Sequence, residues 1–194
     1  MVILCRGIRH TLPVTIVQGA LVGYFDGETI ENCTVKNVHI RMSGTTPAMN
    51  YIKVGGMVGS VDNMASDVHT SMKNCKAENV DIRSIYAVGG LVGQCEDVNI
   101  ELENCSVTNA TLWITSLDER HYNKVGSIVG YIDDNSLTLK NCTASGITYK
   151  VGTQATEAYI IEGGEEGKQE HGPKYALYGY SGEAATVTVK NDEP

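Results

Sequence analysis

The sequence GGLVGQC at residues 89–95, followed by LENCSVTNATL at residues 102–112, decides the fold, because both blocks recur in this order along the chain. Apolar residues alternate within each short run of the second block, and a period of two is typical of a β-strand. Asn104 and Asn109 interrupt the alternation, and asparagine tolerates the left-handed conformation of a sharp corner better than other non-glycine residues. The first block recurs at residues 19–25, 55–61 and 126–132, with a degraded copy at 175–181, and the second at residues 30–40, 72–82 and 139–149, with a broken copy at 189–192.

Each repeat contains three strand segments that are too short to fold alone, so their apolar edges are buried only by stacking on the next repeat. The sequence therefore predicts an all-β parallel β-solenoid, specifically a three-sided right-handed β-helix of four to five coils. The residue before the first corner asparagine supports this arrangement. Its charge alternates in sign through the first four copies, as suits strands stacked in register about 4.8 Å apart. This column is Glu31, Lys73, Glu103, Lys140 and Lys190.

Two further columns concern the core. One glycine of the first block is present in every copy, and we expect it to point inward and let the backbone approach the core closely. One cysteine of the second block also points inward, where a thiol behaves as a small apolar group. In-register neighbours project alongside one another, which favours free thiols over disulfides or a zinc site. The glycines are Gly23, Gly59, Gly93, Gly130 and Gly179, and the cysteines are Cys33, Cys75, Cys105 and Cys142.

The 194 residues are expected to form one solenoid domain. Residues 1–18 are predicted to be an N-terminal cap or partial coil, 19–149 four repeats, 150–174 an insertion loop, and 175–194 a partial fifth repeat or C-terminal cap. A formal charge of −8 with scattered basic residues argues against nucleic acid or an anionic membrane as a partner. The longest uncharged stretch, residues 11–25, is too short for membrane insertion. The first residues also lack the regions of a secretion signal.

The paired blocks resemble the GLUG-motif repeats of bacterial surface and secreted proteins, including adhesin-like proteins. The resemblance covers roughly residues 19–148, with a frayed copy at residues 175–192, and is best at residues 89–93, while Ala20, Ser127 and the fifth copy depart from the pattern. It implies an extracellular or cell-surface module with an adhesive or scaffolding role, which binds a host glycan or an extracellular protein and can be part of a longer surface protein. The resemblance implies no catalytic residue.

The connections from the third strand to the next coil leave one edge of the predicted solenoid, at residues 41–53, 83–87, 113–124 and 150–174. Most large aromatic residues lie in or beside them, and amphipathic aromatic side chains on a rigid scaffold suit contact with sugar or protein. The alternative is that they only cover the loop bases. The predicted binding residues are Tyr51, Tyr86, Trp113, Tyr122 and Tyr159.

Acidic residues follow the first block in each of the first four copies. One interpretation is that they cap the turn after the strand. The other is that their oxygens bind Ca²⁺, although spacers of unequal length would separate the loops. No other cofactor is expected. The candidate ligands are Asp26, Asp62, Glu96, Asp97, Asp133 and Asp134.

Parallel β-helices also carry polysaccharide lyases and glycoside hydrolases, which place carboxylates and a basic residue on one outward wall. The outward positions of the middle strand are instead rich in Ser and Thr with mixed charges, such as Lys36 and Glu78, and contain no carboxylate pair. The sequence therefore predicts a non-catalytic binding module, with a carbohydrate-active enzyme on the same scaffold as the alternative.

Overall fold

The computed structural model describes residues 2–4, 16–42, 51–62, 69–116, 124–152 and 177–191. These residues form strands, and no helix within these ranges is long and apolar enough to cross a membrane. The strands make four sheets, and neighbouring strands in every sheet run parallel and in register. The predicted all-β parallel solenoid is therefore confirmed.

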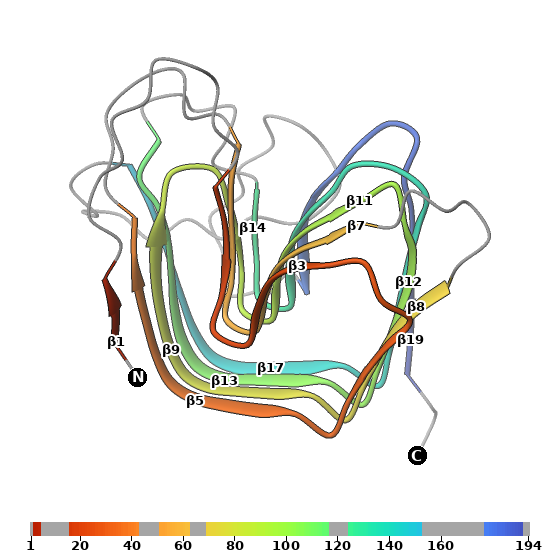
Figure 1. Ribbon diagram of the computed structural model, residues 1–194, viewed down its shortest axis with the longest axis horizontal. Coiled ribbons are helices and arrows are strands. Elements are labelled where there is room, and N and C mark those ends of the chain that lie inside the picture. The colour runs from red at the N-terminus through yellow and green to blue at the C-terminus, as the bar shows by residue number, and fades with distance from the viewer. Residues whose placement is uncertain are drawn as a thin grey trace.

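Each winding of the chain passes through four sheets in turn (Figure 1), which we call sheets B, C, D and A after the first, second, third and fourth strand of a winding. β1 (Val2–Leu4) lies outside this order and pairs with β5 at the edge of sheet A. The first two windings are β2 (Ile16–Gly19), β3 (Val22–Phe25), β4 (Thr29–Glu31) and β5 (Thr34–Arg41), then β6 (Ile52–Gly55), β7 (Val58–Asp62), β8 (His69–Lys73) and β9 (Lys76–Ser84). The next are β10 (Ala87–Gly89), β11 (Val92–Glu96), β12 (Asn99–Glu103) and β13 (Ser106–Ile114), then β14 (Val125–Gly126), β15 (Val129–Ile132), β16 (Ser136–Lys140) and β17 (Thr143–Val151), followed by β18 (Tyr178–Ser181) and β19 (Thr186–Lys190).

The solenoid has a fourth side that the sequence analysis missed, so the expectation of three sides is wrong. Sheet B contains strands of only two to four residues, directly before the glycine block. Such strands are too short to show alternation, and Lys53 interrupts the apolar run of β6. Sheets B and C form a V that points toward sheet A (Figure 1). At its tip, a Cβ on Gly90 would lie 2.9 Å from the Val107 side chain of β13.

The corners form where the sequence predicts them, between sheets D and A and within the strands of sheet A. Asparagines at both positions have a positive φ, and Gly146, which replaces one of them, has a φ of 66°. Amide side chains also form ladders between windings: Asn74 donates to Asn32 over 3.1 Å and Asn79 donates to Asn37 over 3.1 Å. The corner asparagines are Asn32, Asn74, Asn104 and Asn141 at the first position, and Asn37, Asn79 and Asn109 at the second.

The charge column and the cysteine column are confirmed. Lys73 is in register with both Glu31 and Glu103, and Lys140 Nζ contacts Glu103 Oε1 at 2.8 Å. The column cysteines are free, and Cys75, Cys105 and Cys142 are buried. Their thiols donate to carbonyl oxygens of the preceding winding: Cys75 to Ile30 at 3.5 Å, Cys105 to Met72 at 3.4 Å and Cys142 to Leu102 at 3.3 Å.

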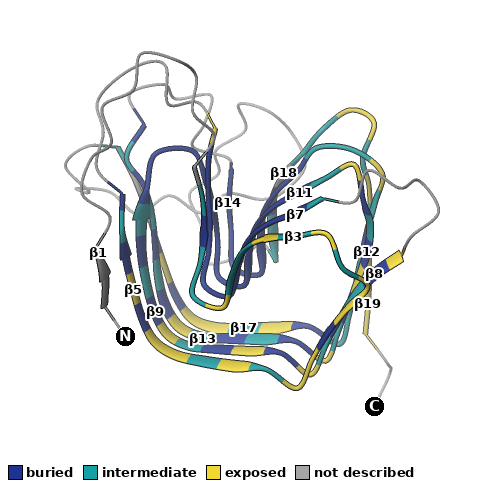
Figure 2. Ribbon diagram, viewed as in Figure 1, coloured by how far each residue is buried: buried dark blue, intermediate teal, exposed yellow. Residues whose placement is uncertain are grey.

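The glycine column lets the backbone of sheet C approach another part of the protein closely, as expected. The part that it approaches is the backbone of sheet B rather than apolar side chains. A Cβ on Gly93 would lie 2.6 Å from Val54 N, and a Cβ on Gly130 would lie 2.6 Å from Val88 C. The buried apolar residues form one cluster, to which all four sheets contribute (Figure 2).

Thiol labelling tests this core. Burial raises the pKa of the Cys95 thiol to about 12, so little of it is the reactive thiolate, and burial keeps a reagent away from the thiols of Cys75, Cys105 and Cys142. Among the described cysteines only Cys33 is partly exposed. In a Cys5→Ser background, which removes the cysteine outside the described residues, we expect one thiol to react quickly with a thiol reagent and four to react only as the protein unfolds. Fast reaction of a second thiol in the native protein would contradict this packing.

Candidate functional site

Near the C-terminal ends of the sheet A strands, basic residues and a tryptophan that point outward form one row. After the second corner, Ile40 and its equivalents Ile82 and Leu112 point inward with no exposed surface. The following residue therefore points outward in each strand. Register places these residues next to one another on successive strands. We call them the basic row: Arg41, Arg83, Trp113 and Lys150.

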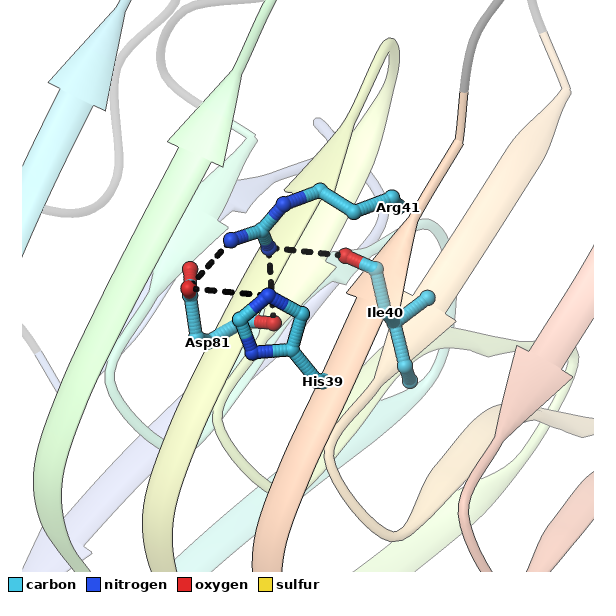
Figure 3. Close-up of polar contacts among 4 residues, drawn as sticks. All are labelled: His39, Ile40, Arg41 and Asp81. Carbon is cyan, nitrogen blue, oxygen red and sulfur yellow. Dashed lines mark hydrogen bonds and ion pairs between the residues drawn. The ribbon is translucent and has the colours of Figure 1, made fainter. Parts of the chain in front are cut away.

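The first member of the row, Arg41, is held by Asp81 of the next strand (Figure 3). Its guanidinium forms an ion pair with the Asp81 carboxylate and also donates to the Asp81 carbonyl oxygen over 3.1 Å. His39 Nε2 lies 3.5 Å from the same carboxylate oxygen. Asp81 is therefore already occupied, and it fixes Arg41 at the end of the row.

Trp113 lies in the middle of the row between two cations. The Arg83 guanidinium carbon lies 4.2 Å from the centroid of the indole ring, and Lys150 Nζ lies 5.8 Å from it. Both distances are within the range of a cation–π interaction. The indole Nε1 donates to the Gly152 carbonyl oxygen over 2.8 Å, which fixes the ring. The indole therefore positions both cations at the surface.

The outer face of sheet A is basic although the whole chain has a formal charge of −8. Its outward positions hold five Lys or Arg and two carboxylates, Glu78 and Asp81. The carboxylates are engaged by Lys36, at 2.8 Å from Glu78, and by Arg41. Among the described residues, Arg83 and Lys150 form no ion pair. Two cations of the row are thus available to an anionic group.

The predicted aromatic binding residues do not form one site. Tyr51 is 52% exposed and lies 6.4 Å from Tyr86, measured between ring centroids. Tyr86 is buried, and its ring and hydroxyl contact Lys124 Nζ, at 4.3 Å and 2.7 Å respectively. Trp113 lies in sheet A, in the basic row. Tyr122 and Tyr159 lie outside the described residues.

The predicted acidic column is divided among separate partners. Asp62 accepts a hydrogen bond from the Tyr24 hydroxyl at 2.8 Å, and Asp133 accepts one from the Tyr131 hydroxyl at 2.5 Å. Glu96 forms an ion pair with Lys53 of sheet B. Among the described residues, no three His, Cys, Asp or Glu side chains are placed to hold a metal ion. The geometry gives the Ca²⁺ prediction for Asp26, Asp62, Glu96, Asp97, Asp133 and Asp134 no support, and it stays a prediction.

A concave surface lies along sheet D, away from the basic row, with a cavity volume of about 290 Å³. Its polar lining includes His69, Lys73 and Glu101, together with Asn99 and Ser136, whose side chains are 2.7 Å apart in a hydrogen bond. The lining contains a single carboxylate.

Sequence reasoning missed the basic row, although a signal was present. Each connection to the next winding begins with a member of the row, so alignment of the four connections places Arg41, Arg83, Trp113 and Lys150 at one position. Continuing the alternation one step past Ile40 turns that position outward.

Comparison of the chain with models of protein families, with curated proteins and with solved structures finds no match.

Proposed function

We propose that the chain is a non-catalytic binding module, which binds a glycan or an extracellular protein at the basic row and the adjoining loop edge. The observation that carries the proposal is the row itself. It places a tryptophan and two cations on successive strands of a sheet, and these cations form no ion pair within the part of the chain that the structure describes. Side chains held in this way lose little conformational freedom when a ligand binds.

The setting that we propose is the surface or the exterior of a bacterium, with an adhesive role. The resemblance to GLUG-motif repeats supports it, because those repeats occur in surface and secreted proteins. A stack of in-register windings also suits adhesion, since neighbouring repeats bury one continuous core and present their outer positions in straight columns. Attachment within a longer surface protein belongs to the same proposal.

A carbohydrate-active enzyme is the second candidate, and the groove on sheet D favours it. His69, Lys73 and Glu101 line the groove and provide acid–base groups beside hydroxyl and amide side chains. Glycoside hydrolysis in most families requires two carboxylates on either side of the scissile bond. The groove lining has only Glu101, so the binding module has the better support.

Arrays of glycans and extracellular matrix proteins, followed by product analysis on the polysaccharides that bind, separate the two functions. We expect saturable binding to one class of ligand and no release of sugar products. Release of products that disappears in Glu101→Gln would establish the enzyme in place of the binding module. Absence of binding to every arrayed ligand would also contradict the proposal.

A further inference from the structure

We infer that the ligand of the basic row is an acidic polysaccharide, whose carboxylate or sulfate groups contact Arg83 and Lys150 while the polymer runs along the stacking axis of the solenoid. This inference rests on the proposed function and specifies its ligand. The row defines the direction, because its members come from successive strands of sheet A.

The charges of the row select an anion. Asp81 occupies Arg41, but among the described residues neither Arg83 nor Lys150 has a carboxylate partner. The Arg83 guanidinium is held against the indole of Trp113, so its planar set of N–H donors is pre-organised. Such a group binds carboxylate, sulfate or phosphate through two parallel hydrogen bonds. A neutral sugar offers no charge to these cations.

The spacing of the row suits a polymer with repeated anionic groups. Arg83 and Lys150 lie on either side of the Trp113 strand, so two strand spacings, about 10 Å, separate their positions. The neighbouring outward column consists of His39, Asp81, Thr111 and Thr148, and its two threonines lie beside Trp113 and Lys150, in register with each other. Their hydroxyl groups can donate to and accept from sugar hydroxyls that lie between two anionic groups.

An acidic peptide fits the same surface less well. Peptides bind to folded domains mainly by adding a strand to a free sheet edge or by placing side chains in pockets. The basic row crosses strands that are paired on both sides from β5 to β13, and in the described part of the chain only β17, which carries Lys150, ends the sheet within the row. A peptide strand added to that edge would lie on the far side of β17 from Trp113 and Arg83. Cations on both neighbouring strands also approach the ring of Trp113, so the row has no open aromatic anchor.

The chain contains a single tryptophan, Trp113, so its intrinsic fluorescence reports on the row directly. Titration with heparin and with polygalacturonate separates sulfate from carboxylate as the anionic group, with dextran as the neutral polymer and polyglutamate as the acidic peptide. We expect a saturable fluorescence change with at least one acidic polysaccharide, weaker affinity as NaCl rises, and no change with dextran or polyglutamate.

Two double variants test the location. Arg83→Gln with Lys150→Gln is expected to weaken binding of the acidic polysaccharide by about tenfold or more, because charge-assisted hydrogen bonds are lost. Lys76→Gln with Lys190→Gln removes the same charge from exposed positions outside the row and is expected to leave affinity within about twofold of the original. Affinity is measured by calorimetry, and thermal melting verifies that each variant is folded.

Several outcomes would overturn the inference. Equal loss of affinity in both double variants would show that binding depends on overall charge rather than on the row. Binding of polyglutamate would identify an acidic protein as the ligand, and binding of only neutral glycans or uncharged proteins would refute the acidic ligand while leaving the binding module intact. If no arrayed ligand binds, the proposed function fails together with the inference.

Discussion

Replacing Gly93 with alanine is expected to destabilise the protein by about 3 kcal/mol or more. The added methyl group would overlap backbone atoms, and these atoms cannot move away without displacing whole strands. A Cβ on Gly93 would lie 2.4 Å from Gly59 O, 2.6 Å from Val54 N and 2.7 Å from Val54 C. All three atoms belong to backbone. Val54 is paired on both sides, with Gln18 of β2 and Val88 of β10, so it cannot retreat without disturbing the whole of sheet B.

Gly23→Ala is the matched control for this prediction. Gly23 occupies the same position in β3, but the nearest atom to its Cβ would be Val17 O at 3.1 Å, and no other atom lies closer than 3.9 Å. We expect its cost to stay below about 1 kcal/mol. Urea unfolding followed by circular dichroism measures both free energies of unfolding. Equal free energies of unfolding for the two variants would show that the close approach of sheets B and C has no role in stability.

The sequence predicts those parts of the fold that depend on repetition and on local backbone preference. Asn37 and Asn79 are identifiable as corners because they break a period of two at the same place in two copies, and both have the positive φ expected there. Repetition also predicts the register of the strands, because aligning two copies of the repeat places Glu31 opposite Lys73, as the structure does. Neither step requires knowledge of contacts between sheets.

The parts that the sequence does not predict depend on contacts between sheets. β6 and β10 are too short to show alternation, so the sequence does not indicate the V formed by sheets B and C. Without that V, the glycine column has no identifiable partner. The candidate site is affected in the same way. The sequence indicates Trp113 as an aromatic binding residue, but it places Arg83 beside Trp113 only if the strand is extended past Ile82.

Breaking the ion pair between Lys53 and Glu96 is expected to cause the second large loss of stability. Lys53 lies in β6 of sheet B with 7% of its side chain exposed, and Glu96 ends β11 of sheet C with 32% exposed. Glu96→Gln leaves the ammonium of Lys53 buried without its charged partner. Breaking a fully buried pair costs 3–5 kcal/mol, and partial exposure of Glu96 reduces the expected loss to about 2 kcal/mol.

A double-mutant cycle distinguishes the cost of an unpaired charge from the value of the pair. Lys53→Met combined with Glu96→Gln removes both charges, and we expect it to recover most of the stability lost in Glu96→Gln. The exposed pair Lys36–Glu78 is the control, since 59% of the Lys36 side chain is exposed, and Lys36→Gln is expected to cost less than about 0.5 kcal/mol. A cost for Glu96→Gln as small as that of Lys36→Gln would mean that water reaches Lys53.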